Sequence, residues 1–295
     1  MRAAILSSVT NVAAELFEEL LVDANVTDPL QKFVTKPQGA VLLGQLAQLI
    51  GIRHRDEELQ RTVSAIVAIG VTNDQGLWQP LLMELGRGLK RTGKRLTLES
   101  YSEVENKWLT NRFERAVDTS ANREADDEVR AAVVELIGCF PPERSRAKLL
   151  DLLTVESPEP VQIAVMRAMA DDHDTALEKR LLDLWPGFTP ESKRIALETM
   201  LSREDRTILW LQAAVDGKVS AAEIDSIRRD MLKEHANPQI KLLAERAFRN
   251  IVSSSRQAVI AEYQLVLAMQ GRIEEGARVF EKNCATCHQV GGKGV

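Results

Sequence analysis

Aromatic residues are scarce in this sequence and make up only 4% of its 295 residues. Strands favour aromatic and β-branched side chains, so this scarcity argues against an extensive sheet. The abundant Leu, Ala, Glu and Arg are instead good helix formers. No stretch shows the sustained alternation of apolar and polar residues that is typical of a strand. The composition therefore predicts an all-α protein.

An excess of positive charge is also missing. The net charge is −5 and both signs are spread along the chain, unlike the basic footprint of a nucleic-acid-binding protein. No apolar run reaches the roughly 18 residues that would cross a bilayer, and the apolar part of the N-terminal segment is too short for a signal peptide. A serine nucleophile elbow, a zinc-protease helix motif and a glycine-rich dinucleotide fingerprint are all absent. No catalytic constellation is therefore visible, and whether the chain belongs to an enzyme stays open.

Apolar residues recur at helical spacing along the first third of the chain. The pattern predicts helices over residues 12–22, 41–50, 56–69 and 78–91. Gly51 and Gly70 follow the second and third of these stretches, and we expect each glycine to end its helix. Cys139 follows another apolar run and is expected to pack as a small hydrophobic side chain.

A short group of residues repeats in the middle of the chain. Residues 129–134 resemble 161–166 and 193–197, and more weakly 240–244; the spacing from Arg130 to Gln162 to Arg194 is 32 residues each time. Each copy opens a helix just after a turn that contains Asp, Pro or Glu: residues 126–128, 157–160, 189–191 and 237–238. A proline or an acid suits the free amide groups and the dipole at a helix N-terminus.

Periods of this length in a helical chain predict a solenoid of stacked helix pairs. The pattern resembles degenerate HEAT repeats over residues 1–253, most clearly over 126–253. This resemblance implies an α-solenoid in which antiparallel helix pairs form a right-handed superhelix, and we expect the repeat domain to span residues 1–270. The alternative is an irregular helical bundle in which the similarity arose by chance.

Two further segments resemble binding motifs. Residues 88–94 fit the spacing of a phosphate-binding loop, but Arg95 replaces the Ser or Thr that would hold magnesium, and the segment ends a predicted helix instead of opening one. We expect its cations to interact with the helix dipole. Residues 171–174, Asp-Asp-His-Asp, lie between two predicted helices and are expected to form a solvated helix cap, not a metal site.

The most specific motif is Cys284-Ala285-Thr286-Cys287-His288. Two thiols at this spacing can bond covalently to the two vinyl groups of haem, and the adjacent histidine can then be the proximal iron ligand. The alternatives are a zinc half-site, which lacks a second pair of ligands, and a redox dithiol, which normally lies in a βαβ unit. The preceding Gly-x-x-Val-Phe helix and the glycines that follow are similar to those of cytochrome c domains.

The resemblance implies that residues 271–295 are the first part of a C-terminal cytochrome c domain. Only seven residues follow His288, and every methionine precedes the motif. We therefore expect a truncated domain limited to its N-terminal helix, haem c on the full-length protein and no haem on this fragment.

The combination of HEAT-like repeats with this motif resembles the large planctomycete-type proteins that are described as membrane-bound dehydrogenases with a haem-binding domain. The resemblance implies an extracytoplasmic (periplasmic) location, electron transfer, and protein partners or neighbouring domains of the same chain. The alternative is a HEAT-like protein–protein interaction scaffold with no direct redox role.

Overall fold

The computed structural model describes residues 12–22, 36–72, 76–98, 100–249, 251 and 263–294. In chain order its α-helices are α2 (Ala13–Val22), α4 (Pro37–Arg53), α5 (Asp56–Thr72), α6 (Trp78–Lys90), α7 (Glu103–Ala121), α8 (Asp127–Ile137), α9 (Pro142–Leu152), α10 (Glu159–Ala168), α11 (Ala176–Leu184), α12 (Pro190–Leu201), α13 (Glu204–Val215), α14 (Ser226–Lys233), α15 (Pro238–Ala247) and α17 (Ile273–Asn283). Short 3-10 helices are η2 (Trp185–Gly187), η3 (Ala221–Glu223) and η4 (Gln264–Ala268). Within these ranges the only β-type pairing is one isolated bridge. The all-α prediction is confirmed.

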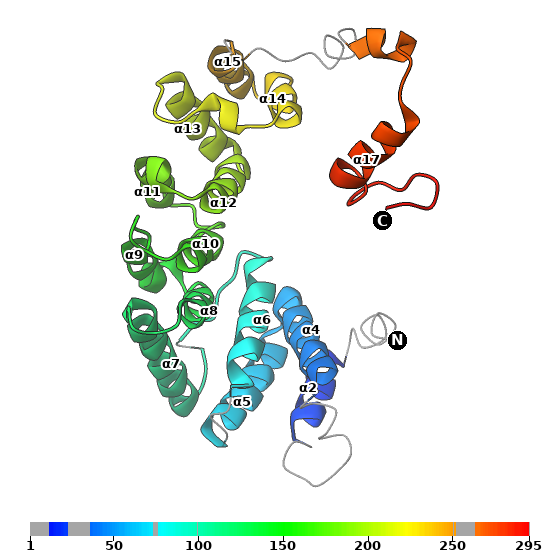
Figure 1. Ribbon diagram of the computed structural model, residues 1–295. Coiled ribbons are helices and arrows are strands. Elements are labelled where there is room, and N and C mark those ends of the chain that lie inside the picture. Colours follow the sequence, from blue (N-terminus) through cyan, green and yellow to red (C-terminus); the bar gives the residue numbers. More distant parts are fainter. Residues whose placement is uncertain are drawn as a thin grey trace.

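Most of these helices form a curved stack of two layers. Helices α7, α9 and α11 lie along one side of the stack, and α8, α10 and α12 lie along the other (Figure 1). Helix α8 packs against α7 and α10, and α10 packs against α12. Each helix therefore buries its apolar stripe against the next pair, which is how stacked repeats build a continuous core.

The helix starts follow the turn residues that the sequence indicated. Asp126 precedes α8 and accepts hydrogen bonds from two backbone amides, at 3.0 and 3.2 Å. Thr189 accepts one from Ser192 before α12, and Asn237 accepts one from Gln239 before α15. These side chains bond the amide groups that the first helical turn leaves unpaired.

The repeat register differs by one residue from the predicted spacing. The buried positions of α12 match those of α10 when Lys193, not Arg194, is aligned with Gln162. Arg194 is exposed and pairs with glutamates of its own helix. Gln162 is buried, donates to the Thr154 carbonyl at 2.9 Å and accepts from Ser192 at 2.8 Å, and so links α10 to α12.

The prediction that Gly51 and Gly70 end helices is wrong. Helix α4 continues past Gly51 to Arg53, and α5 continues past Gly70 to Thr72. Both glycines instead allow close packing between helices. A β-carbon on Gly51 would lie 2.4 Å from the Leu85 carbonyl oxygen of α6, and one on Gly70 would lie 2.2 Å from the Trp108 ring.

A buried polar network lies where residues 171–174 were predicted to form a solvated cap. Asp172 is only 6% exposed, and its carboxylate pairs with the Arg146 guanidinium at 2.7 and 2.8 Å. Arg206 is fully buried, pairs with the buried Glu178 and donates to the Asp172 carbonyl at 2.6 Å. The expectation of solvent exposure is wrong for Asp172, because arginines from α9 and α13 enclose this turn. Asp174 alone behaves as a cap and accepts a hydrogen bond from the Ala176 amide at 2.8 Å.

Candidate functional site

Helix α17 leads into the cysteine motif and stands apart from the stack (Figure 1). The buried core of the described residues runs from Ala13 to Phe248 and includes no residue of α17. Apolar side chains of this helix are open to solvent: Ile273 is 90% exposed and Val279 is 58% exposed. The helix is therefore amphipathic but has no apolar partner among the described residues.

The five motif residues form one tight turn at the end of α17. The amides of Cys284 and Ala285 both donate to the Phe280 carbonyl, at 2.8 and 2.9 Å. The amides of Cys287 and His288 then donate to the Cys284 carbonyl, at 3.1 and 2.9 Å. The structure thus brings the predicted site residues Cys284, Cys287 and His288 together on one turn.

Glycines fold the chain back over this turn. Gly291 and Gly292 have φ values of 59° and 78°, in the left-handed region, and they connect Val290 and Lys293, which exchange backbone hydrogen bonds. Gly294 also has a positive φ, 96°, and a β-carbon there would lie 2.0 Å from the His288 carbonyl oxygen. Only glycine fits this conformation at such close range.

The two thiols of the motif are free and reachable. Cys284 is half-buried, Cys287 is exposed, and neither forms a disulfide. His288 is also exposed. This donor set fits haem c, because covalent attachment needs two reduced, accessible thiols and an imidazole beside them. Within the described ranges, no three His, Cys, Asp or Glu side chains lie together so that they would hold a metal ion.

Comparison with known proteins agrees with this local geometry. The cytochrome c family model matches residues 273–295, which are α17 and the turn after it. No curated protein and no solved structure matches the chain. The family match therefore concerns the C-terminal segment and leaves the helical stack unassigned.

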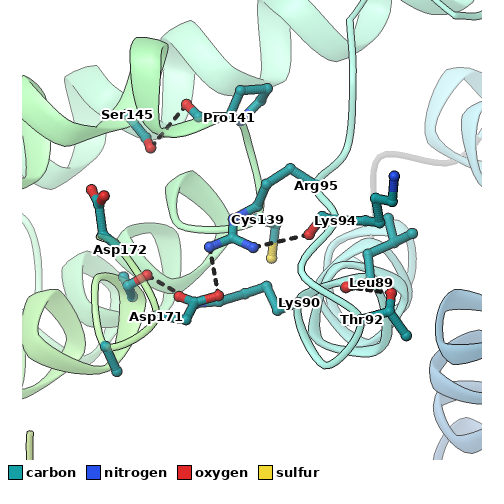
Figure 2. Close-up of polar contacts among 12 residues, drawn as sticks. Leu89, Lys90, Thr92, Lys94, Arg95, Cys139, Pro141, Ser145, Asp171 and Asp172 are labelled. Carbon is teal, nitrogen blue, oxygen red and sulfur yellow. Dashed lines mark hydrogen bonds and ion pairs between the residues drawn. The ribbon is translucent and has the colours of Figure 1, made fainter. Parts of the chain in front are cut away.

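The loop at residues 88–94 ends a helix, as the sequence indicated. Helix α6 stops at Lys90, and Gly93 turns the chain with a φ of 73°. Lys90 donates to the Ala168 carbonyl at 2.8 Å and pairs with Asp171 at 3.3 Å, and Arg95 pairs with the same carboxylate at 2.5 Å (Figure 2). Lys90, at the end of α6, thus binds both the C-terminal end of α10 and the turn after it, and Arg95 binds that turn.

Cys139 packs as the sequence predicted. It is 2% exposed, and its sulfur fills the space left by Gly86, where a β-carbon would lie only 2.4 Å away. Burial raises the pKa of the Cys139 thiol to about 11. The thiol is therefore protonated at neutral pH and is a poor nucleophile.

Sequence reasoning missed one aromatic cluster. The guanidinium carbon of Arg112 lies 4.7 Å from the Trp78 ring centre and 4.9 Å from that of Trp108, and the two rings pack edge to face. Trp108 and Arg112 are four residues apart on α7, a spacing that places them on one face. That spacing was a usable signal, but the Trp78 partner comes from α6 and was not predictable locally.

No helix among the described residues combines the length and apolarity needed to cross a membrane.

Proposed function

We propose that this protein is a helical repeat scaffold that carries a c-type cytochrome unit for electron transfer. In this proposal residues 1–270 form the HEAT-like repeat domain, a right-handed superhelix, and residues 271–295 begin the cytochrome c domain. The observation that carries the proposal is the Cys284–His288 turn at the end of α17, inside the segment that matches the cytochrome c family.

The residues of the turn have defined roles in this proposal. Cys284 and Cys287 would hold haem c through thioether bonds, and His288 would be a ligand of its iron. Haem c would supply one-electron transfer. The hydrogen bonds from the Cys287 and His288 amides to the Cys284 carbonyl fix the spacing of the three side chains, and the glycines after His288 hold the following chain close to it.

We further propose that the protein acts outside the cytoplasm, in the periplasm, as part of a larger dehydrogenase-type protein. Covalent haem attachment takes place there, and the sequence resemblance supplies the dehydrogenase context. The stacked helices would position the cytochrome relative to a neighbouring catalytic domain, because repeat stacks offer long, stable surfaces.

A haem assay tests the proposal. The natural protein, as encoded by its gene, is co-expressed with c-type maturation proteins, and a pyridine haemochrome spectrum is recorded. We expect covalent haem on the wild type and on a Cys139→Ala control, but none on the Cys284→Ser/Cys287→Ser variant. Absence of covalent haem on the wild type, when a reference cytochrome matures in the same cells, would refute the electron-transfer function.

A second candidate is a protein-interaction scaffold without a direct redox role. The curved stack favours it, because one layer of helices carries open hollows between successive helices. The haem assay separates the two candidates, because covalent haem on the wild type supports the cytochrome unit and its absence leaves the scaffold alone.

A further inference from the structure

Three hollows adjoin along one layer of the stack. The first, about 370 Å³, lies among α4, α6, α8 and α10; the second, about 380 Å³, lies between α10 and α12; the third, about 310 Å³, lies beside α12 and α14. Arg167 lines both the first and the second, and Arg194 lines both the second and the third. The hollows therefore lie next to one another in a row, which we call the inner groove.

The charge of the first hollow is opposite to that of the whole chain. Its charged lining consists of Arg87, Lys90, Arg91 and Arg167 against a single acid, Glu135. The chain as a whole carries a net charge of −5. A local cationic surface on an anionic protein attracts acidic groups over a short range without making the whole molecule a general binder of anions.

Two of these cations are not held in a close ion pair. Arg87 pairs with glutamates of α6 and α8, and Lys90 is occupied by Asp171 and by a carbonyl at the end of α10 (Figure 2). Arg91, just after α6, and Arg167, in the last turn of α10, are both exposed. Within the part of the chain that the structure describes, neither side chain forms a close ion pair or a hydrogen bond. Arg167 nevertheless lies near Glu191 of α12, because Arg194 and, to a smaller extent, Arg167 lower the pKa of that carboxyl. Both side chains line the first hollow, and each guanidinium has five N–H donors to offer an incoming acceptor.

We infer that the inner groove binds an acidic, extended segment of a partner protein, whose carboxylates pair with Arg91 and Arg167. A guanidinium binds a carboxylate through two parallel hydrogen bonds, which gives orientation as well as attraction. The row of hollows along successive helices suits an extended chain better than a compact ligand. The inference rests on the scaffold part of the proposed function and does not require haem.

The C-terminal segment of the same chain is a poor occupant. Residues 263–294 contain Arg272, Arg278, Lys282 and Lys293 against only three glutamates. They therefore offer no acidic excess to the groove.

Binding of a fluorescein-labelled Glu-Ala repeat peptide, measured by anisotropy on the chain of residues 1–295, tests the inference. The groove variant is Arg91→Glu/Arg167→Glu. Its matched control is Arg115→Glu/Lys179→Glu, which makes the same change in net charge at exposed positions of α7 and α11, in the other layer. Circular dichroism spectra and melting curves confirm that both variants fold. A Gln-Ala repeat peptide and a single-stranded oligonucleotide serve as comparison probes.

We expect the acidic peptide to bind the wild type and the control alike, and to bind the groove variant about tenfold more weakly, because reversed charges repel the carboxylates. Binding should also weaken as salt is added. No binding of the acidic peptide to the wild type, or an equal loss in both variants, would overturn the inference. Tighter binding of the oligonucleotide or of the Gln-Ala peptide would show that the partner chemistry is wrong. None of these results depends on haem attachment, so failure here is distinguishable from failure of the haem assay.

Discussion

Replacing Gly51 by alanine tests how α4 and α6 pack so closely. The added β-carbon would lie 2.4 Å from the Leu85 carbonyl oxygen and 2.9 Å from the Leu89 amide nitrogen. Both neighbours are backbone atoms of α6, so neither can rotate away. Because carbon and oxygen normally approach no closer than about 3.3 Å, the two helices would have to separate by about 1 Å.

The expected loss of stability follows from two opposing effects. Alanine in a helix is favoured over glycine by about 1 kcal/mol. Overpacking against an immobile backbone costs about 3 kcal/mol, the upper end of the usual range. We therefore expect Gly51→Ala to lower the free energy of unfolding by about 2 kcal/mol, or to lower Tm by about 4–8 °C.

Gly44 supplies a matched control on the same helix. A β-carbon there would meet only the Glu84 side chain, at 3.2 Å, and that flexible chain can move. Gly44→Ala should therefore be neutral or should stabilise the protein by up to about 1 kcal/mol. The assay is urea unfolding followed by far-ultraviolet circular dichroism and tryptophan fluorescence, with coincident curves as the check on two-state behaviour. If Gly51→Ala proved as stable as Gly44→Ala, the close-packing argument would be refuted.

Three further predictions concern acid sensitivity, thiol reactivity and the C-terminal segment. Burial alone would raise the pKa of Asp172, but hydrogen bonds from Arg146 outweigh it and hold that pKa below its ordinary value. The ionised Asp172 carboxylate therefore stabilises the fold above about pH 4, and this stabilisation is lost as pH falls further. Asp172→Asn should lower the free energy of unfolding by about 3 kcal/mol at pH 7 and should weaken the acid dependence of Tm. An unchanged Tm–pH profile would contradict this. Iodoacetamide at pH 8 should alkylate Cys287 quickly and Cys139 only after unfolding, because burial raises the pKa of Cys139 to about 11; equal labelling rates by mass spectrometry would disprove the buried thiol. Deleting residues 276–295 should leave Tm within a few degrees, since this segment adds nothing to the buried core of the described residues, and a lost cooperative transition would show the opposite.

Local signals in the sequence predicted much of the helix pattern correctly. Helices α8, α12 and α15 begin where Asp126, Thr189 and Asn237 offer a side-chain oxygen to free amides. Such capping depends on residues only two or three positions apart, and so it is visible in the sequence. The cysteine motif is equally local. Cys284, Cys287 and His288 share one backbone turn because five consecutive residues form it.

Glycine showed where local reasoning fails. In the sequence Gly51 and Gly70 look like helix stops, but both lie inside helices. Each is a glycine because a neighbouring helix approaches too closely for a side chain. The sequence shows that a glycine lacks a side chain and does not show what occupies the vacated space. The same limit applies to Asp172, which accepts hydrogen bonds from three arginines: Arg146 of α9, Arg203 just before α13 and Arg206 of α13.

By itself the sequence determined the helical class, the starts of α8, α12 and α15, and the shared turn that carries Cys284, Cys287 and His288, because each depends on residues within about one turn of one another. The tertiary structure alone decided the one-residue shift of the repeat at Lys193, the burial of Asp172 and the placing of Arg91 beside Arg167 in one groove. Those features arise from helices far apart in the sequence, where close packing and electrostatics, not local preference, select the contacts.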